Sequence, residues 1–285
     1  MKLKDALFGE LVKNGYSQMK DGRKVWDAAN RSFLYMTPEL VKSFLKLRNH
    51  PRYVKTITEI ETKLLGKYAE NITNSFENIS FNLIDMGCED GSKAKILIES
   101  LNGKGKIRFC SVNVSKELAD MALKNIKNVK YENVAECKKC VSDFRSLHHV
   151  VTMIKGAEYQ KNVIMLLGSI LASFEIHDYL FNLSQAMFKG DVLIIGNGIR
   201  VGERFVNLEN YKGVLFKEWF DNLMKEIGFN LRDIEYDARF ANGRLECFYR
   251  IKKDKTISYK GKRVEFKIGD EIVIAILYKY YENEL

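Results

Sequence analysis

Hydrophobic positions along the chain form two patterns that alternate with each other. Strand-like segments occur at 81–84, 106–114, 161–167 and 192–196, and the segment at 161–167 contains the continuous apolar run that is typical of a strand buried on both faces of a parallel sheet. Apolar residues spaced three or four apart, typical of helices packed on such a sheet, occupy 92–101, 115–126 and 176–188. A third strand is expected to begin at 129–131. Strands and helices that alternate through short turns predict an α/β fold with a doubly wound sheet.

The pattern changes on both sides of this region. Before it, the periodicity predicts helices within 1–20, 38–47 and 56–69. After Gly196 it predicts a helix at 217–227 and strands at 231–240, 244–251, 262–268 and 271–280. Asn242-Gly243, between the first two of these strands, is a strong hairpin signal. The chain therefore divides into an α/β core and a second, smaller set of helices and strands.

The turn after the first core strand carries the candidate chemistry. Asp85 ends the strand, and Gly87 and Gly91 supply the positive-φ freedom and small size that let a ligand approach the backbone before a helix begins at Ser92. The spacing lacks the three glycines of a dinucleotide fingerprint. It resembles motif I of class I S-adenosylmethionine (SAM) methyltransferases, an acidic residue before a G-x-G-x-G turn, with Glu89 in place of the middle glycine. An ordinary strand–helix turn is the alternative.

Polar residues also follow the other predicted core strands. Asn113 ends the second strand, where a doubly wound sheet places the group that binds a ribose hydroxyl. Asp143 and Phe144 fit the acidic and apolar pair that class I methyltransferases use for adenine, with a simple Asx turn as the alternative. Gly168 and Ser169 follow the run at 161–167, at the edge where ligand and substrate usually meet. Together with the glycine turn, these strand ends predict one binding site.

Composition limits the remaining possibilities. The chain has 285 residues, 46% of them hydrophobic, but no apolar run long enough to span a membrane and no signal peptide, so we expect a cytoplasmic protein. The formal net charge of +9 permits a nucleic-acid partner, although lysines spread among acidic residues favour a solvated surface. The five cysteines are expected to be reduced. Cys137 and Cys140 are interpreted as part of a charged surface loop and not as a zinc site.

Taken together, the motifs resemble those of the histidine-specific Nα-methyltransferases, SAM-dependent enzymes that make histidine betaine on the way to ergothioneine. Gly87 through Lys93 look like the family's glycine turn, 112–115 like its Val-Asp-Val-Ser, and 167–169 like its Leu-Gly-Ser. Further similar segments occur at 50–59, 143–144, 190–196 and 269–280. Each match is short, but their order and spacing are specific and cover most of the chain.

The resemblance implies a class I SAM-methyltransferase (Rossmann-like) core at 56–200 and a smaller α+β satellite domain at 1–55 and 201–285 that covers the substrate. It implies SAM as the cofactor, and the residues expected to bind it are Asp85, Gly87, Gly91, Lys93, Asn113, Asp143, Phe144 and Gly168. Tyr53, Ser169 and Ser173 are expected to face a small-molecule substrate. Methyl transfer from a sulfonium needs alignment and a neutral amine, so no catalytic nucleophile and no metal are expected.

Departures from the family's pattern fall on the substrate side. Ser173 stands where an asparagine holds the amino-acid head group, and Ala275 and Leu277 stand where a glutamate and a serine grip the imidazole; Gly198 replaces an aspartate. Loss of buried polar partners removes the reason for a polar ring to bind there. The predicted reaction is therefore N-methylation of a small amine or amino-acid-like substrate other than histidine.

Two other functions and one question of architecture stay open. The protein could be a catalytically inactive binding protein with the methyltransferase fold, or a methyltransferase of RNA or protein. Where the family continues into its last strands, this chain either uses the hairpin at Asn242-Gly243 as a replacement or has a shorter sheet. The oligomeric state is left unspecified.

Overall fold

The computed structural model describes residues 2–76, 78–154, 158–159, 161–200 and 208–284. Its backbone groups into two compact units, Arg48–Asn197, here called the core unit, and Met1–Leu47 with Gly198–Leu285, here called the second unit. Each is described by itself. The predicted domains at 56–200 and at 1–55 with 201–285, and the substrate-covering role of the latter, remain predictions.

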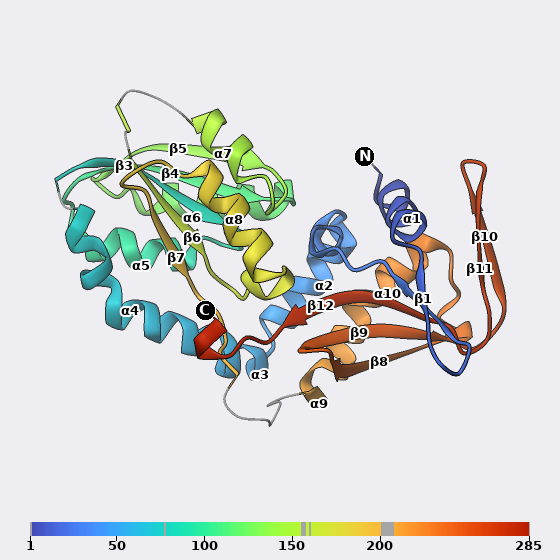
Figure 1. Cartoon of the computed structure of the whole chain (residues 1–285). Coiled ribbons are helices and arrows are strands. Elements are labelled where there is room, and N and C mark those ends of the chain that lie inside the picture. The colour runs from blue at the N-terminus through green and yellow to red at the C-terminus, as the bar shows by residue number, and fades with distance from the viewer. Residues whose placement is uncertain (1, 77, 155–157, 160, 201–207, 285) are drawn as a thin grey trace. The chain divides into compact units, whose positions relative to one another are not determined.

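A parallel sheet with the strand order β5-β4-β3-β6-β7 forms the centre of the core unit (Figure 1). Its strands are β3 (Ser80–Met86), β4 (Lys106–Asn113), β5 (Val134–Val141), β6 (Lys161–Leu166) and β7 (Val192–Ile195). All described neighbours in it are parallel. Because the chain adds β4 and β5 on one side of β3 and then β6 and β7 on the other, this is a doubly wound sheet whose crevice lies between β3 and β6. The predicted fold class is confirmed.

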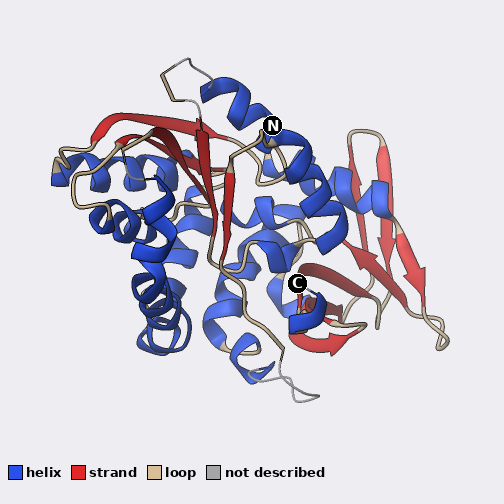
Figure 2. Ribbon diagram, turned by 60° about the vertical axis from the view of Figure 1, so that its left-hand side comes forward, coloured by secondary structure: helices blue, strands red, loops and turns tan. Residues whose placement is uncertain are grey.

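Helices flank this sheet, with strands lying between them in Figure 2. They are α3 (Pro51–Tyr53), α4 (Glu59–Thr73), α5 (Ser92–Ser100), α6 (Lys116–Val129), α7 (Leu147–Ile154) and α8 (Ile176–Ala186). Short turns of other helix types occupy Val54–Thr58, Asn74–Phe76 and Leu171–Ser173. α6 begins as predicted, because the Ser115 hydroxyl accepts the Leu118 N–H at 3.3 Å.

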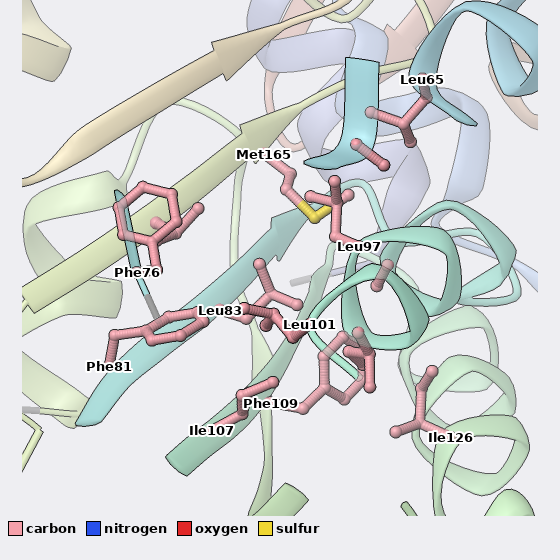
Figure 3. Packing of buried hydrophobic residues seen from close by; sticks show 14 of the residues in the cluster. Leu65, Phe76, Phe81, Leu83, Leu97, Leu101, Ile107, Phe109, Ile126 and Met165 are labelled. Atoms are coloured by element: carbon pink, nitrogen blue, oxygen red, sulfur yellow. The ribbon is translucent and has the colours of Figure 1, made fainter. Parts of the chain in front are cut away.

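One buried cluster joins β3, β4 and β6 to α4, α5 and α6 (Figure 3). Leu83, Phe109 and Met165 project from the strands and pack with Leu97 and Ile126 from the helices. Burial of apolar surface stabilises by about 25 cal/mol per Å². This packing fixes the end of β3 relative to the start of α5, and so fixes the glycine turn between them.

The third strand lies later than predicted, and the reason is its place in the sheet. Residue 129 ends α6, Lys130 is the C-cap with a φ of 54°, and β5 begins only at Val134. β5 is an edge strand whose apolar residues are interrupted by Glu136, Lys138 and Lys139, so it lacks the continuous apolar run of a central strand. Cys137 and Cys140 lie within it, so their interpretation as a surface loop is wrong. Among the described residues, no group of three His, Cys, Asp or Glu could hold a metal ion.

The second unit contains a mixed sheet and a separate hairpin. The sheet has the order β1-β2-β12-β9-β8, with β1 (Tyr16–Gln18), β2 (Lys24–Asp27), β12 (Glu271–Tyr278), β9 (Arg244–Ile251) and β8 (Ile234–Ala241). β10 (Lys255–Tyr259) pairs with β11 (Lys262–Phe266). The helices are α1 (Leu3–Asn14), α2 (Pro38–Arg48), α9 (Leu208–Tyr211) and α10 (Val214–Ile227), with short turns at Arg31–Tyr35, Leu231–Asp233 and Glu282–Glu284.

The hairpin at Asn242-Gly243 forms as predicted between β8 and β9, with positive φ at both residues. It belongs to the sheet of the second unit, so the parallel sheet, as far as the structure describes it, is the shorter of the two expected alternatives. β12 pairs with β2 in parallel, which brings the two ends of the sequence into one sheet. No helix in the described ranges is both long and apolar enough to cross a membrane.

Candidate functional site

The glycine turn between β3 and α5 requires glycine for two reasons. Gly87 and Gly91 have φ values of 77° and 78°, which side chains rarely adopt. A β-carbon on Gly87 would lie 2.3 Å from Ile170 Cδ1 and 3.4 Å from Phe144 Cε1. On Gly91 it would lie 3.2 Å from the Ala122 carbonyl oxygen. The predicted residues Gly87 and Phe144 are therefore brought together, and Ile170 covers the turn.

Asp85, at the carboxyl end of β3, is a buried acid with unsatisfied hydrogen-bonding capacity. The residue is 3% exposed, and its Oδ2 has no hydrogen-bond partner in the described part of the chain. Burial raises the pKa of its carboxyl from 3.8 to about 7, against the opposing attraction of Lys93. An orphaned buried carboxylate oxygen at a strand end indicates a place for a cationic or hydrogen-bond-donating group.

Lys93 lies buried beside this carboxyl and pairs with a residue that the sequence analysis missed. Its Nζ is 2.7 Å from Glu61 Oε2, and Glu61 Oε1 accepts the Gly168 N–H at 2.6 Å. Burial alone would lower the pKa of Lys93, but Glu89 and Glu61 outweigh it and raise that pKa. Glu61 therefore ties α4 and α5 to the end of β6, and brings Lys93 to Gly168.

A signal for Glu61 was present in the sequence. Glu61, Leu65 and Ala69 are spaced by four, so they share one face of α4, and the last two are buried. The neighbouring apolar residues Ile60 and Leu64 are 53% and 54% exposed, so apolar character alone does not identify the buried face. A carboxylate on the buried face of a helix needs a partner, and this need indicates a structural or functional role for Glu61.

Arg48 holds the acidic residues of the turn. Its Nε lies 2.9 Å from Glu89 Oε2 and its Nη2 lies 2.8 Å from Asp90 Oδ2. Asp90 Oδ1 in turn accepts the Ser92 N–H at 3.1 Å, at the first turn of α5. Burial opposes ionisation of Asp90, but the Arg48 guanidinium prevails and holds the pKa of Asp90 below its usual value. Sequence analysis gave no role to Arg48, because it lies far from the turn along the chain.

Asn113 and Asp143 both make local contacts. Asn113 Oδ1 accepts the Ser115 N–H at 3.0 Å, and its side chain also bonds the buried Cys88 thiol, whose pKa is raised by burial. Asp143 Oδ1 accepts the Arg145 N–H at 2.8 Å and the Arg145 Nε–H at 2.9 Å. The Asx turn considered as the alternative for Asp143 is therefore present, and its role toward adenine remains a prediction.

The three residues expected to face substrate are placed as follows. Tyr53 is half-buried at the end of α3. Ser169 follows Gly168 with a φ of 57°, and the Ser173 N–H donates to the Ile170 carbonyl at 3.0 Å. Ser169 and Ser173 thus lie in the segment after β6, near the glycine turn that Ile170 covers. Their contact with a substrate remains a prediction.

Replacing Glu61 by glutamine tests the buried ion pair. Glutamine keeps an oxygen for the Gly168 N–H but leaves the Lys93 ammonium with less compensating charge, so we expect a loss of about 1–3 kcal/mol in the free energy of unfolding. The matched control is Glu59→Gln, since Glu59 is exposed and pairs with Lys63 at 3.5 Å, where a change below about 0.5 kcal/mol is expected. Urea unfolding measures both, and equal losses would contradict the assignment.

The residues present fit the polar ends of SAM. Its methionine part carries an ammonium and a carboxylate, and the end of β3 offers a buried carboxylate oxygen on Asp85 beside the buried Lys93 ammonium. Gly87 gives the turn its positive φ, and Asn113 lies at the end of the adjacent strand. The doubly wound sheet, its glycine turn and this charged strand end define a class I SAM-dependent methyltransferase.

The chain belongs to the family of histidine-specific, SAM-dependent methyltransferases, whose model matches residues 41–285. It is therefore a methyltransferase that uses SAM as its cofactor. No curated protein matches the chain.

Solved structures of methyltransferases are similar to it at low sequence identity. A candidate SAM-dependent methyltransferase from Methanococcus maripaludis is 18% identical over 84% of this chain and 92% of that one, with a TM-score of 0.37. A SAM-dependent methyltransferase from Aquifex aeolicus is 13% identical over 68% and 88%, with a TM-score of 0.36. The plantazolicin methyltransferase BpumL, in complex with S-adenosylhomocysteine, is 14% identical over 72% and 75%, with a TM-score of 0.37.

Proposed function

We propose that this enzyme methylates a nitrogen of a small amine or amino-acid-like molecule other than histidine. Membership of the family identifies SAM as the methyl donor. The residues that depart from the family's sequence pattern are those expected to contact the methyl acceptor. Ala275 lies on β12 with 7% exposure, directly after a register shift in the pairing with β9, and Leu277 follows on the same strand. Neither side chain can hydrogen-bond an imidazole, so a less polar group suits that position better.

For the cofactor we propose the carboxyl edge of β3, β4, β5 and β6. The observation that carries this is the buried Asp85 Oδ2, which lacks a partner beside the Lys93–Glu61 pair. Asp85 and Lys93 would hold the methionine end, Gly87, Gly91 and Gly168 would let it approach the backbone, and the following residues would hold the nucleoside: Asn113, Asp143 and Phe144. Tyr53, Ser169 and Ser173 would face the acceptor.

SAM, when bound, supplies a methyl group on a positively charged sulfur. The chain's own contribution is then to align the acceptor, keep its amine neutral and exclude water. A buried strand end suits this task, because its charged groups are already held in place. They can bind the polar ends of a ligand without reorganising. Because SAM supplies the electrophile and the acceptor supplies the nucleophile, no nucleophile from the protein is needed.

Binding of S-adenosylhomocysteine in calorimetry tests the cofactor site. We expect wild-type protein to bind it and Asp143→Ala to bind it at least about tenfold more weakly, the scale of one lost hydrogen bond. Asp120→Ala is the matched control, since Asp120 lies on α6 and contacts the exposed side chain of Lys139. If wild type fails to bind at saturating ligand, the proposed cofactor site is wrong.

Restoring the family's polar pair tests the acceptor. The double variant Ala275→Glu, Leu277→Ser should bind histidine at least about tenfold more tightly than wild type, since one or two hydrogen bonds are regained. Phenylalanine serves as the comparison ligand and should not gain. Calorimetry with both amino acids in the presence of S-adenosylhomocysteine measures this, with thermal unfolding as a check on folding. An equal gain in affinity for histidine and phenylalanine would contradict the proposal that positions 275 and 277 select the acceptor.

A further inference from the structure

Glu89 occupies the place of the middle glycine in the turn and keeps the backbone conformation of a glycine. Its φ is 45°, in the left-handed region. For a residue with a β-carbon this conformation costs roughly 1–2 kcal/mol. Strain of this kind persists only where the surroundings hold the residue in place, and it gathers at functional sites.

Arg48 is what holds it. The guanidinium and the Glu89 side chain are only 11% and 20% exposed, and their closest atoms, Nε and Oε2, are 2.9 Å apart. The same guanidinium binds Asp90, which caps the first turn of α5 through the Ser92 N–H. Arg48 therefore fixes one oxygen of Glu89 relative to the helix that begins at the turn.

The other oxygen of Glu89 is directed toward the end of β6. Glu89 Oε1 lies 3.5 Å from the position a β-carbon would take on Gly168, and Lys93 Nζ lies 3.0 Å from that same position. A carboxylate and an ammonium thus both lie beside the backbone of Gly168. The ends of β3 and β6 form the crevice of this sheet, where ligands of doubly wound folds bind.

The charges around this point are unbalanced. Two cations, Arg48 and Lys93, stand against four acidic groups that act on one another electrostatically: Glu61, Asp85, Glu89 and Asp90. Arg48 already binds two of those carboxylates, and Lys93 binds Glu61. An added ammonium is therefore favoured here. Asp85 Oδ2 and Glu89 Oε1, the oxygen of Glu89 that Arg48 Nε does not bind, are the carboxylate oxygens that can accept from it.

We propose that Glu89 binds the α-ammonium of the methionine end of SAM and that Arg48 is the positioning residue that aims it. This inference rests on the proposed cofactor site. In this enzyme a carboxylate, in place of bare glycine backbone, then selects ligands that carry an amino-acid end.

Two ligands separate this role from a structural one. S-Adenosylhomocysteine carries the amino-acid end, and 5′-methylthioadenosine is the same thioether nucleoside without it. We expect Glu89→Gly and the size-matched Glu89→Gln to bind S-adenosylhomocysteine at least about tenfold more weakly, and 5′-methylthioadenosine within about twofold of wild type. Arg48→Ala should show the same selective loss, and Arg48→Lys should recover part of it.

Asn102→Gly is the matched control, because Asn102 has a φ of 49° and carries no charge, so the change relieves similar backbone strain. It should leave both affinities unchanged. Calorimetry measures the affinities, and thermal unfolding confirms that each variant is folded. Equal losses for both ligands, or unchanged binding of S-adenosylhomocysteine in both Glu89 variants, would overturn the assignment. Failure of wild type to bind either ligand would instead overturn the cofactor site itself, and this role with it.

Discussion

Replacing Asp85 by asparagine should stabilise the unliganded protein at pH 8 by up to about 4 kcal/mol and should weaken its binding of SAM. The pKa of the Asp85 carboxyl is raised from 3.8 to about 7 by burial, and each pKa unit corresponds to about 1.4 kcal/mol. Above pH 7 the folded protein carries this carboxylate ionised and poorly solvated. Asparagine has nearly the same shape without the charge.

The sign of the pH dependence follows from the same shift. Between about pH 4 and pH 7 the folded state binds more protons at Asp85 than the unfolded state, so the free energy of unfolding falls as the pH rises through this range. The difference between Asp85→Asn and wild type should therefore be small near pH 4 and largest above pH 7. Urea unfolding at several pH values measures it. A difference that does not vary with pH would show that Asp85 has an ordinary pKa.

The affinity for SAM should depend on pH in the opposite sense. SAM brings an ammonium and a sulfonium, which favour the ionised form of Asp85, so wild-type affinity should rise between pH 6 and pH 8. Asp85→Asn should bind SAM at least about tenfold more weakly at pH 8 and lose this rise. S-Adenosylhomocysteine, which lacks the sulfonium charge, should show a smaller rise. Calorimetry in buffers of different ionisation enthalpy also counts the proton released on binding.

Replacing Gly87 by alanine should destabilise the protein by about 2–5 kcal/mol. The positive φ contributes about 1–2 kcal/mol, and the contact at 2.3 Å with Ile170 Cδ1 adds the cost of overpacking, about 1–3 kcal/mol. Ile170 can relieve the clash by turning its Cδ1 away, which changes how it packs on the turn. We therefore also expect Gly87→Ala to weaken S-adenosylhomocysteine binding, because displacement of Ile170 disturbs the turn at which the cofactor site is proposed.

Gly103→Ala is the control that separates the two contributions. Gly103 has the same φ of 77° but nothing within 4 Å of the position of its β-carbon. Its replacement should cost only about 1–2 kcal/mol, the backbone part, and should leave ligand binding intact. Chemical unfolding and calorimetry compare the two variants. Equal destabilisation would mean that Ile170 does not pack against the turn.

Much of the core could be predicted from local sequence. β3, β4 and β6 could be predicted because they are central strands whose residues are almost all buried, and β7 because its four residues are all apolar. Ser115 marks the start of α6 because its hydroxyl caps the helix. β5 was not located in the same way because its sequence, unlike that of β7, is interrupted by charged residues. Shorter or less periodic elements, among them β1, β2, β10 and α7, also had no pattern long enough to predict them.

The site divides in the same way. Asp85, Gly87 and Gly91 were found because a strand end and two positive-φ glycines are close together in sequence and follow from the geometry of one turn. Glu61 and Arg48 were not, since their importance depends on which face of α4 is buried and on the approach of residue 48 to the turn. The destination of the last strands was equally undetermined, because β12 could pair with β9 and β2 only after distant segments had met. Local periodicity and backbone strain thus determined the elements and the glycine turn, while the charges that surround the turn were decided by long-range packing, which no single stretch of sequence encodes.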